Sequence, residues 1–139
     1  MTTSDIPIRK YDLLLKGGRV IDPANNIDGN FDVATSGGHI ALVEKDISPA
    51  LARTVADVSR LVVTPGLVDL HAHFYGYFGA ISPDAHCLPE GTTTAVDAGG
   101  SGHLTFDDFN EQVIDPATTN VFALLNIAGE GMIGEPEQD

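Results

Sequence analysis

Three short apolar segments in the second half of the chain constrain the fold more than any other feature. These segments have the composition of β-strands and lie at residues 67–73, 92–97 and 121–127. A helical pattern at residues 105–113 separates the second segment from the third, and Thr105 with Asp108 three residues later predicts a capped helix start. Strands that alternate with helices indicate an α/β fold with a parallel sheet. Three such strands predict an incomplete sheet, because its edges and faces stay open.

The chain before this region predicts a small antiparallel β unit over residues 1–60. Gly17-Gly18 and Gly37-Gly38 each predict a two-residue hairpin turn, and the second pair lies between strand-like residues 31–35 and 39–44. Residues 98–102 (AGGSG) follow the second apolar segment of the α/β region and predict a loop of small residues. The sequence thus divides into a β unit at 1–60 and an α/β unit at 61–139.

Charge is unevenly distributed between these parts. The formal net charge is −13, and residues 61–139 contain twelve acidic residues but no lysine or arginine. This balance argues against binding to nucleic-acid phosphates or to anionic membranes, because both need a basic surface. A single cysteine permits no internal disulfide. The first residues lack a signal-peptide pattern and no apolar run is long enough to span a bilayer, so a cytoplasmic protein is expected.

The strongest chemical signal is Asp69-Leu70-His71-Ala72-His73. Alternate side chains of a strand share a face, so Asp69, His71 and His73 are expected to point together. Two imidazoles at this spacing can bind one metal ion at the end of the strand, where a parallel barrel has its active site. Two chance surface histidines are the alternative. Asp69 either supports a histidine ligand or is hydrogen-bonded to the backbone, and the sequence leaves both open.

Residues 64–73 (TPGLVDLHAH) resemble the first barrel strand of the amidohydrolase superfamily of metal-dependent hydrolases. Residues 13–23 (LLLKGGRVIDP) and 31–45 (FDVATSGGHIALVEK) resemble the N-terminal β-sandwich strands of that family, and 91–99 (GTTTAVDAG) is similar to its dihydroorotase-like and deacetylase branch. The resemblance implies a β-sandwich portion followed by the first three strands of a (β/α)8 barrel of the TIM type, truncated in this chain.

The resemblance also implies a site of one or two Zn²⁺ ions with His71 and His73 as ligands, in which the metal activates a hydroxide. Such a site needs a bridging carboxylated lysine, two further histidines and a catalytic aspartate from later strands. No lysine follows Lys45, so the catalytic residues are expected beyond residue 139 and the 139-residue chain alone is expected to be inactive. Dihydroorotases usually have an arginine two residues after the second histidine, where Tyr75 stands here. This favours an N-acyl substrate, or an acyl ester, over dihydroorotate.

The full-length protein is therefore expected to hydrolyse a carbon–nitrogen amide bond, cyclic or N-acyl, in a small molecule. A non-catalytic fragment or binding module of the same fold is the alternative, and a hydantoinase-like or D-aminoacylase-like specificity also stays open. His103 is a substrate-binding candidate, because it lies in the loop after the second strand of the α/β unit. Cys87 is expected to pack inside, and Asp97 and Asn126 to form structural hydrogen bonds. Copies of the chain are expected to associate through open strand edges.

Overall fold

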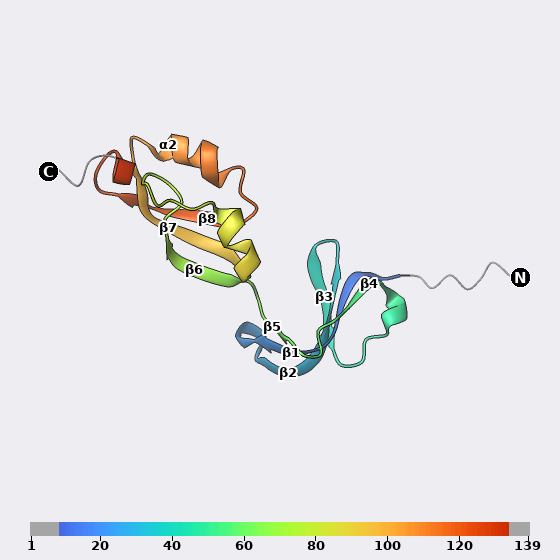
Figure 1. The fold of residues 1–139 in the computed structure, drawn as a ribbon. Coiled ribbons are helices and arrows are strands. Elements are labelled where there is room, and N and C mark those ends of the chain that lie inside the picture. Colours follow the sequence, from blue (N-terminus) through green and yellow to red (C-terminus); the bar gives the residue numbers. More distant parts are fainter. Residues whose placement is uncertain (1–8, 134–139) are drawn as a thin grey trace, which may run out of the picture. The chain divides into compact units, whose positions relative to one another are not determined.

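The computed structural model describes residues 9–133, which form two compact units that meet in the chain at Pro65 and Gly66 (Figure 1). The first unit contains β1 (Tyr11–Asp22), η1 (Pro23–Asn25), β2 (Ile27–Ser36), β3 (His39–Glu44), η2 (Pro49–Leu51), β4 (Ala52–Asp57) and β5 (Val62–Val63). The second contains β6 (Leu67–Ala72), α1 (Pro83–His86), η3 (Leu88–Glu90), β7 (Thr92–Gly102), α2 (Phe106–Phe109), the π-helical η4 (Asn110–Ile114), β8 (Asn120–Asn126) and η5 (Gly131–Ile133). No helix among these residues is long and apolar enough to cross a membrane.

The first unit is a mixed sheet rather than the antiparallel one that the sequence predicted. The strand order is β3-β2-β1-β4, and β5 also pairs with β1. β2 pairs antiparallel with both of its neighbours, whereas β4 and β5 run parallel to β1. Residues 45–51, which include η2, connect β3 to β4. Because β5 belongs to this sheet, the structure places the junction between the units after residue 65 rather than residue 60.

The two glycine pairs have different roles. Gly37 and Gly38 form the predicted hairpin turn, both with positive φ. The hairpin predicted at Gly17-Gly18 is wrong, because β1 runs through it with a register shift between Leu15 and Gly18. Gly17 has a φ of 80°, and its N–H donates to the buried carboxylate of Asp32 at 2.7 Å. The extra residue therefore forms a β-bulge, and the Asp32 side chain accepts the backbone N–H that the bulge leaves unpaired.

The second unit is a three-stranded parallel sheet in the order β6-β7-β8. This arrangement confirms the strand–helix–strand pattern predicted from the sequence. One face of the sheet packs against the helical segments through a buried apolar core. That core consists of Ala72, Phe74, Cys87, Ala95, Phe109 and Val121. Cys87 is buried in it, as predicted.

The opposite face of this sheet is exposed in the described residues. Register pairs Val68 with Thr94 on β7, and Phe122 and Leu124 with Val96 and Ala98. Val68, Phe122 and Leu124 are 59–60% exposed, so this face of the sheet stays open. Apolar side chains at this exposure are typical of a surface that another protein segment covers.

The carboxyl end of β7 is a strand where the sequence predicted a loop. β7 continues to Gly102, and β-carbons built at Gly76 and at Gly131 would collide with the carbonyl oxygen of Gly100. Glycine at these positions lets three backbone segments meet. The predicted helix follows, but Thr105 does not cap it. The Thr105 hydroxyl instead accepts from the N–H of Gly102 at 3.1 Å and donates to the carbonyl of Glu130 at 3.1 Å.

Candidate metal centre

The two predicted ligand residues lie side by side at the carboxyl end of β6. His71 is the penultimate residue of the strand and is exposed, while His73 directly follows it and is half-buried. Their ring centroids are 5.3 Å apart and the rings are nearly perpendicular, at 84°. Tyr77 approaches the other side of His73, with its ring centroid 5.6 Å from the imidazole. The structure therefore brings the pair together as the alternation predicted.

Asp69 does not share the face of the two histidines. Asp69 pairs with Ala95 and Ala72 pairs with Asp97, and the register shifts between these two pairs. The shift is a bulge that leaves Asp69 and Ala72 both on the helical side, although they are three positions apart. The Asp69 carboxylate accepts the backbone N–H of His71 at 3.0 Å. Of the two alternatives that the sequence left open for Asp69, the structure shows the hydrogen bond to the backbone.

Asp97 holds the chain immediately after the histidine pair. Its side chain is fully buried, and its two oxygens accept the N–H of Phe74 at 2.7 Å and the N–H of Gly100 at 2.6 Å. Phe74 follows His73 directly, so this carboxylate ties the end of β6 to the end of β7. The structural role expected for Asp97 is confirmed, and it bears on the position of the His73 backbone.

The other predicted residues lie around the same ends of the strands. His103 is exposed in the turn after β7, and a β-carbon built at Gly129 would lie 3.0 Å from its ring. The Asn126 amide donates to the carbonyl of Gly99 at 3.1 Å and accepts the N–H of Ala128 at 3.0 Å, a structural role as expected. Tyr75 stacks on Phe109 at 5.0 Å, so its ring belongs to the helical side of the sheet.

The donor set of this site fits a divalent transition metal. Nδ1 of His73 is buried and has no hydrogen-bond partner among the described residues. A buried polar atom without a partner is costly, and neutral imidazole nitrogens are common ligands of such metals. The described residues contain no group of three histidine, cysteine or acidic side chains that could hold an ion. Within residues 9–133, His71 and His73 would thus supply only two of the ligands that such a metal site needs.

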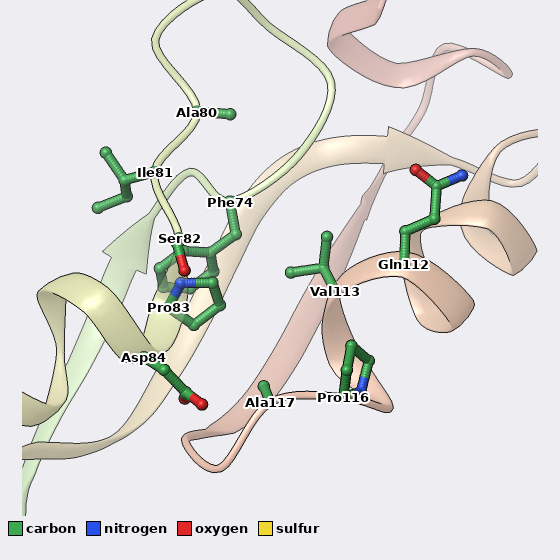
Figure 2. A pocket seen from close by; sticks show the side chains of 10 residues that line it. All are labelled: Phe74, Ala80, Ile81, Ser82, Pro83, Asp84, Gln112, Val113, Pro116 and Ala117. Carbon is green, nitrogen blue, oxygen red and sulfur yellow. The ribbon is translucent and has the colours of Figure 1, made fainter.

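A separate cavity of about 380 Å³ lies on the helical side of the sheet (Figure 2). Phe74, Pro83 and Val113 line it, and Asp84 lies at its edge. Asp84 accepts the N–H groups of Thr118 and Thr119 and the Thr119 hydroxyl, at 2.8–3.0 Å. The backbone bonds from Thr118 and Thr119 lower the pKa of the Asp84 carboxyl to about 2. Asp84 therefore joins α1 to the loop before β8.

The hydrogen bonds of Asp84 predict that its contribution to the stability of the fold depends on pH. The pKa of Asp84 falls from its ordinary 3.8 to about 2 on folding, so its contribution is present above pH 3.8 and is lost as the pH falls toward 2. Asp84→Ala in the full-length protein is expected to lower the thermal midpoint at pH 5, and the difference from wild type should narrow between pH 4 and 2. The matched control is Glu111→Ala, an exposed carboxylate in η4. A constant difference across this range would contradict the assignment.

Sequence reasoning missed Tyr77 and Asp84 as residues that shape this region. Tyr77 lies four residues after His73 in a run of four aromatic residues interrupted by one glycine (FYGYF), and that density was the available signal. For Asp84 the signal was its place after Ser82-Pro83 at a helix start. The signal at Asp84 does not identify its partners, because Thr118 and Thr119 lie more than thirty residues away.

No protein-family model matches the chain. A dihydroorotase of Geobacter metallireducens is 40% identical over 121 residues, which cover 87% of this chain and 28% of that protein. A deacetylase of Agrobacterium fabrum is 33% identical over 98 residues, 69% of this chain and 24% of the relative. The matched residues span 14–28% of the length of such curated relatives.

Solved structures of the same kind resemble the fold. A crystal structure of a dihydroorotase matches with a TM-score of 0.72 and 30% identity, over 87% of this chain and 32% of that one. A D-aminoacylase, described with a binuclear metal centre, matches with a TM-score of 0.51 and 34% identity, over 68% of this chain and 19% of that one. With the paired histidines at the end of a parallel strand, these similarities show that the chain belongs to the amidohydrolase superfamily and corresponds to an N-terminal portion of such a protein.

Proposed function

We propose that the full-length protein is a metal-dependent hydrolase that cleaves a carbon–nitrogen amide bond in a small molecule. The observation that carries this proposal is the His71–His73 pair, with rings 5.3 Å apart at the carboxyl end of β6 and a buried, unpartnered Nδ1 on His73. The dihydroorotase, deacetylase and D-aminoacylase relatives support the reaction class.

In this proposal His71 and His73 hold one ion, which we take to be Zn²⁺. When bound, such an ion lowers the pKa of water toward neutrality and polarises the carbonyl that is attacked. The role of this chain is to present the two imidazole rings in a fixed orientation. The Asp69 bond to the His71 backbone and the Asp97 bond to the Phe74 backbone hold the strand end that carries them. His103, in the turn after β7, is our candidate for contact with the substrate.

The proposed architecture is a β-sandwich portion followed by the first three strands of a (β/α)8 barrel. The exposed apolar face of β6, β7 and β8 supports it, because the interior layers of such a barrel would cover Val68, Phe122 and Leu124. The remaining ligands and the catalytic acid/base would come from later barrel strands. The cytoplasmic location and the association of copies through strand edges stay predictions.

We favour an N-acyl substrate over dihydroorotate. Tyr75 stands where dihydroorotases usually have their arginine, and its ring stacks on Phe109 rather than pointing toward the histidines. The sequence contains no lysine or arginine after Arg60, so no other residue of the α/β unit can replace that arginine.

The test is to assay the full-length protein on N-acyl amino acids and on cyclic ureides, before and after dialysis against a chelator. Release of a primary amine from the N-acyl series is expected, with loss of turnover on metal removal and recovery with Zn²⁺. Turnover that survives complete metal removal would contradict the mechanism. Bound metal with no hydrolysis of any amide would instead favour the non-catalytic binding module.

A further inference from the structure

A groove of about 520 Å³, lined by aromatic and aliphatic side chains together with polar atoms, lies beside the histidine pair. Its lining residues are Tyr75, Gly76, Tyr77, Phe78, Met132 and Ile133. They come from the segment after β6 and from η5, which follows β8, so the groove belongs to the carboxyl ends of the strands. Tyr77 links it to the site, because its ring is 5.6 Å from that of His73 and packs edge-on against it.

The two walls of this groove are held together by backbone packing. Gly76 has a φ of 91°, and a β-carbon there would collide with the carbonyl of Gly100 and come within 3.3 Å of Ile133. Gly131 approaches the same carbonyl from η5, and a β-carbon there would also collide. Both walls therefore rest on the end of β7, with no room for a side chain between them. The groove is formed before any ligand arrives.

The exposed side chains of this lining carry no charge. Phe78 is fully exposed, and Tyr77, Met132 and Ile133 are between 36% and 47% exposed, so apolar surface faces the solvent beside the site. A single exposed apolar side chain is ordinary, whereas several on adjoining loops indicate a binding surface. No lysine or arginine occurs in this half of the chain to pair with an anion.

We propose that this groove binds the acyl substituent of the amide substrate, and that the substituent is an uncharged chain longer than acetyl. The inference rests on the proposed function, because the groove adjoins the histidines that would hold the metal. Hydrolysis adds water across the amide, so the groove would hold the acyl part that leaves as the carboxylic acid. Tyr77 and Phe78 would then set the preference for chain length.

The experiment uses the full-length metal-loaded protein and compares kcat/KM for N-acetyl-, N-butanoyl- and N-hexanoyl-alanine. N-succinyl-alanine has the same number of acyl carbons as the butanoyl compound but carries a charge. An increase of about two- to fourfold per added methylene is expected, since each buried methylene lowers the free energy of binding. The butanoyl compound should be preferred to the succinyl one. The hexanoyl/acetyl ratio within one preparation is independent of the fraction of active protein.

Phe78→Asp and Ile133→Asp are expected to bring the hexanoyl/acetyl ratio toward one. Phe78 is fully exposed, so its replacement removes little packing, and Phe78→Ser gives a second, uncharged variant. Leu88→Asp is the matched control, because Leu88 lies in η3 at the amino-terminal end of the strands. A flat chain-length series, a preference for the succinyl compound, or ratios unchanged in the Phe78 and Ile133 variants would overturn this inference while leaving the hydrolase intact. Hydrolysis of cyclic ureides alone would overturn it together with the N-acyl preference.

Discussion

Alanine at His71 or His73 is expected to reduce the metal affinity of the full-length protein by more than about a hundredfold. Loss of a partner that only orients a ligand already costs 10–100-fold, and removal of the ligand itself should cost more. The two imidazoles lie 5.3 Å apart, so each single variant leaves the other ring without its partner at the ion. Metal content after dialysis at a fixed free Zn²⁺ concentration measures the loss, and turnover should fall with it.

The matched control for these variants is His86→Ala. His86 is the last residue of α1 and is exposed, so it tests the removal of a histidine without touching the pair. Its metal content and turnover should equal those of wild type. Wild-type metal content in both the His71 and the His73 variants would show that these histidines are surface residues, the alternative that the sequence left open.

Asp97→Asn is expected to destabilise the protein by about 1–3 kcal/mol, the typical cost of leaving a buried hydrogen-bonding group without its partner. The asparagine has the shape of the aspartate, but its NH₂ group must face one of the two N–H donors, from Phe74 or Gly100. The midpoint of denaturant unfolding measures the change. Metal affinity should also fall, because the Phe74 N–H lies directly after His73.

Asp107→Asn provides the comparison for Asp97. Asp107 is exposed in the first turn of α2. Loss of its charge should lower the free energy of unfolding by only about 0.3–1 kcal/mol. Equal unfolding midpoints for the two asparagine variants would contradict the role given to Asp97. A destabilised Asp97 variant with unchanged metal affinity would limit that role to stability alone.

Local patterns predicted those parts of the structure that local chemistry determines. The hairpin at Gly37-Gly38 and the three parallel strands follow from turn residues and apolar runs within a few positions of each other. The approach of His71 to His73 follows from strand alternation in the same way. Their role as metal ligands remains a proposal that the expected variants test.

The mistaken predictions share a distant partner or an irregular register. Gly17-Gly18 has the composition of a turn, but the carboxylate of Asp32, fifteen residues away, accepts the Gly17 N–H and stabilises a bulge. Thr105 has the spacing of a helix cap, but its hydroxyl accepts the N–H of Gly102 and donates to the carbonyl of Glu130, twenty-five residues away. No rule of local spacing includes Asp32 or Glu130 as a partner.

The bulge in β6 is the clearest case of such an irregularity. Strict alternation predicts one face for Asp69, His71 and His73, and the register shift moves Asp69 to the other face. The two histidine rings still lie close together, as alternation predicted. The prediction that Asp69 shares their face is wrong. The sequence did not predict the groove beside the two histidines. It forms only because the segments after β6 and β8 both pack against Gly100.

The most direct test of the account is anomalous X-ray diffraction from crystals of the full-length protein, recorded on both sides of the zinc absorption edge. The account predicts one strong anomalous peak about 2.0–2.1 Å from a ring nitrogen of both His71 and His73. Metal found only at other residues, or metal-free histidines in a protein that hydrolyses amides, would contradict it.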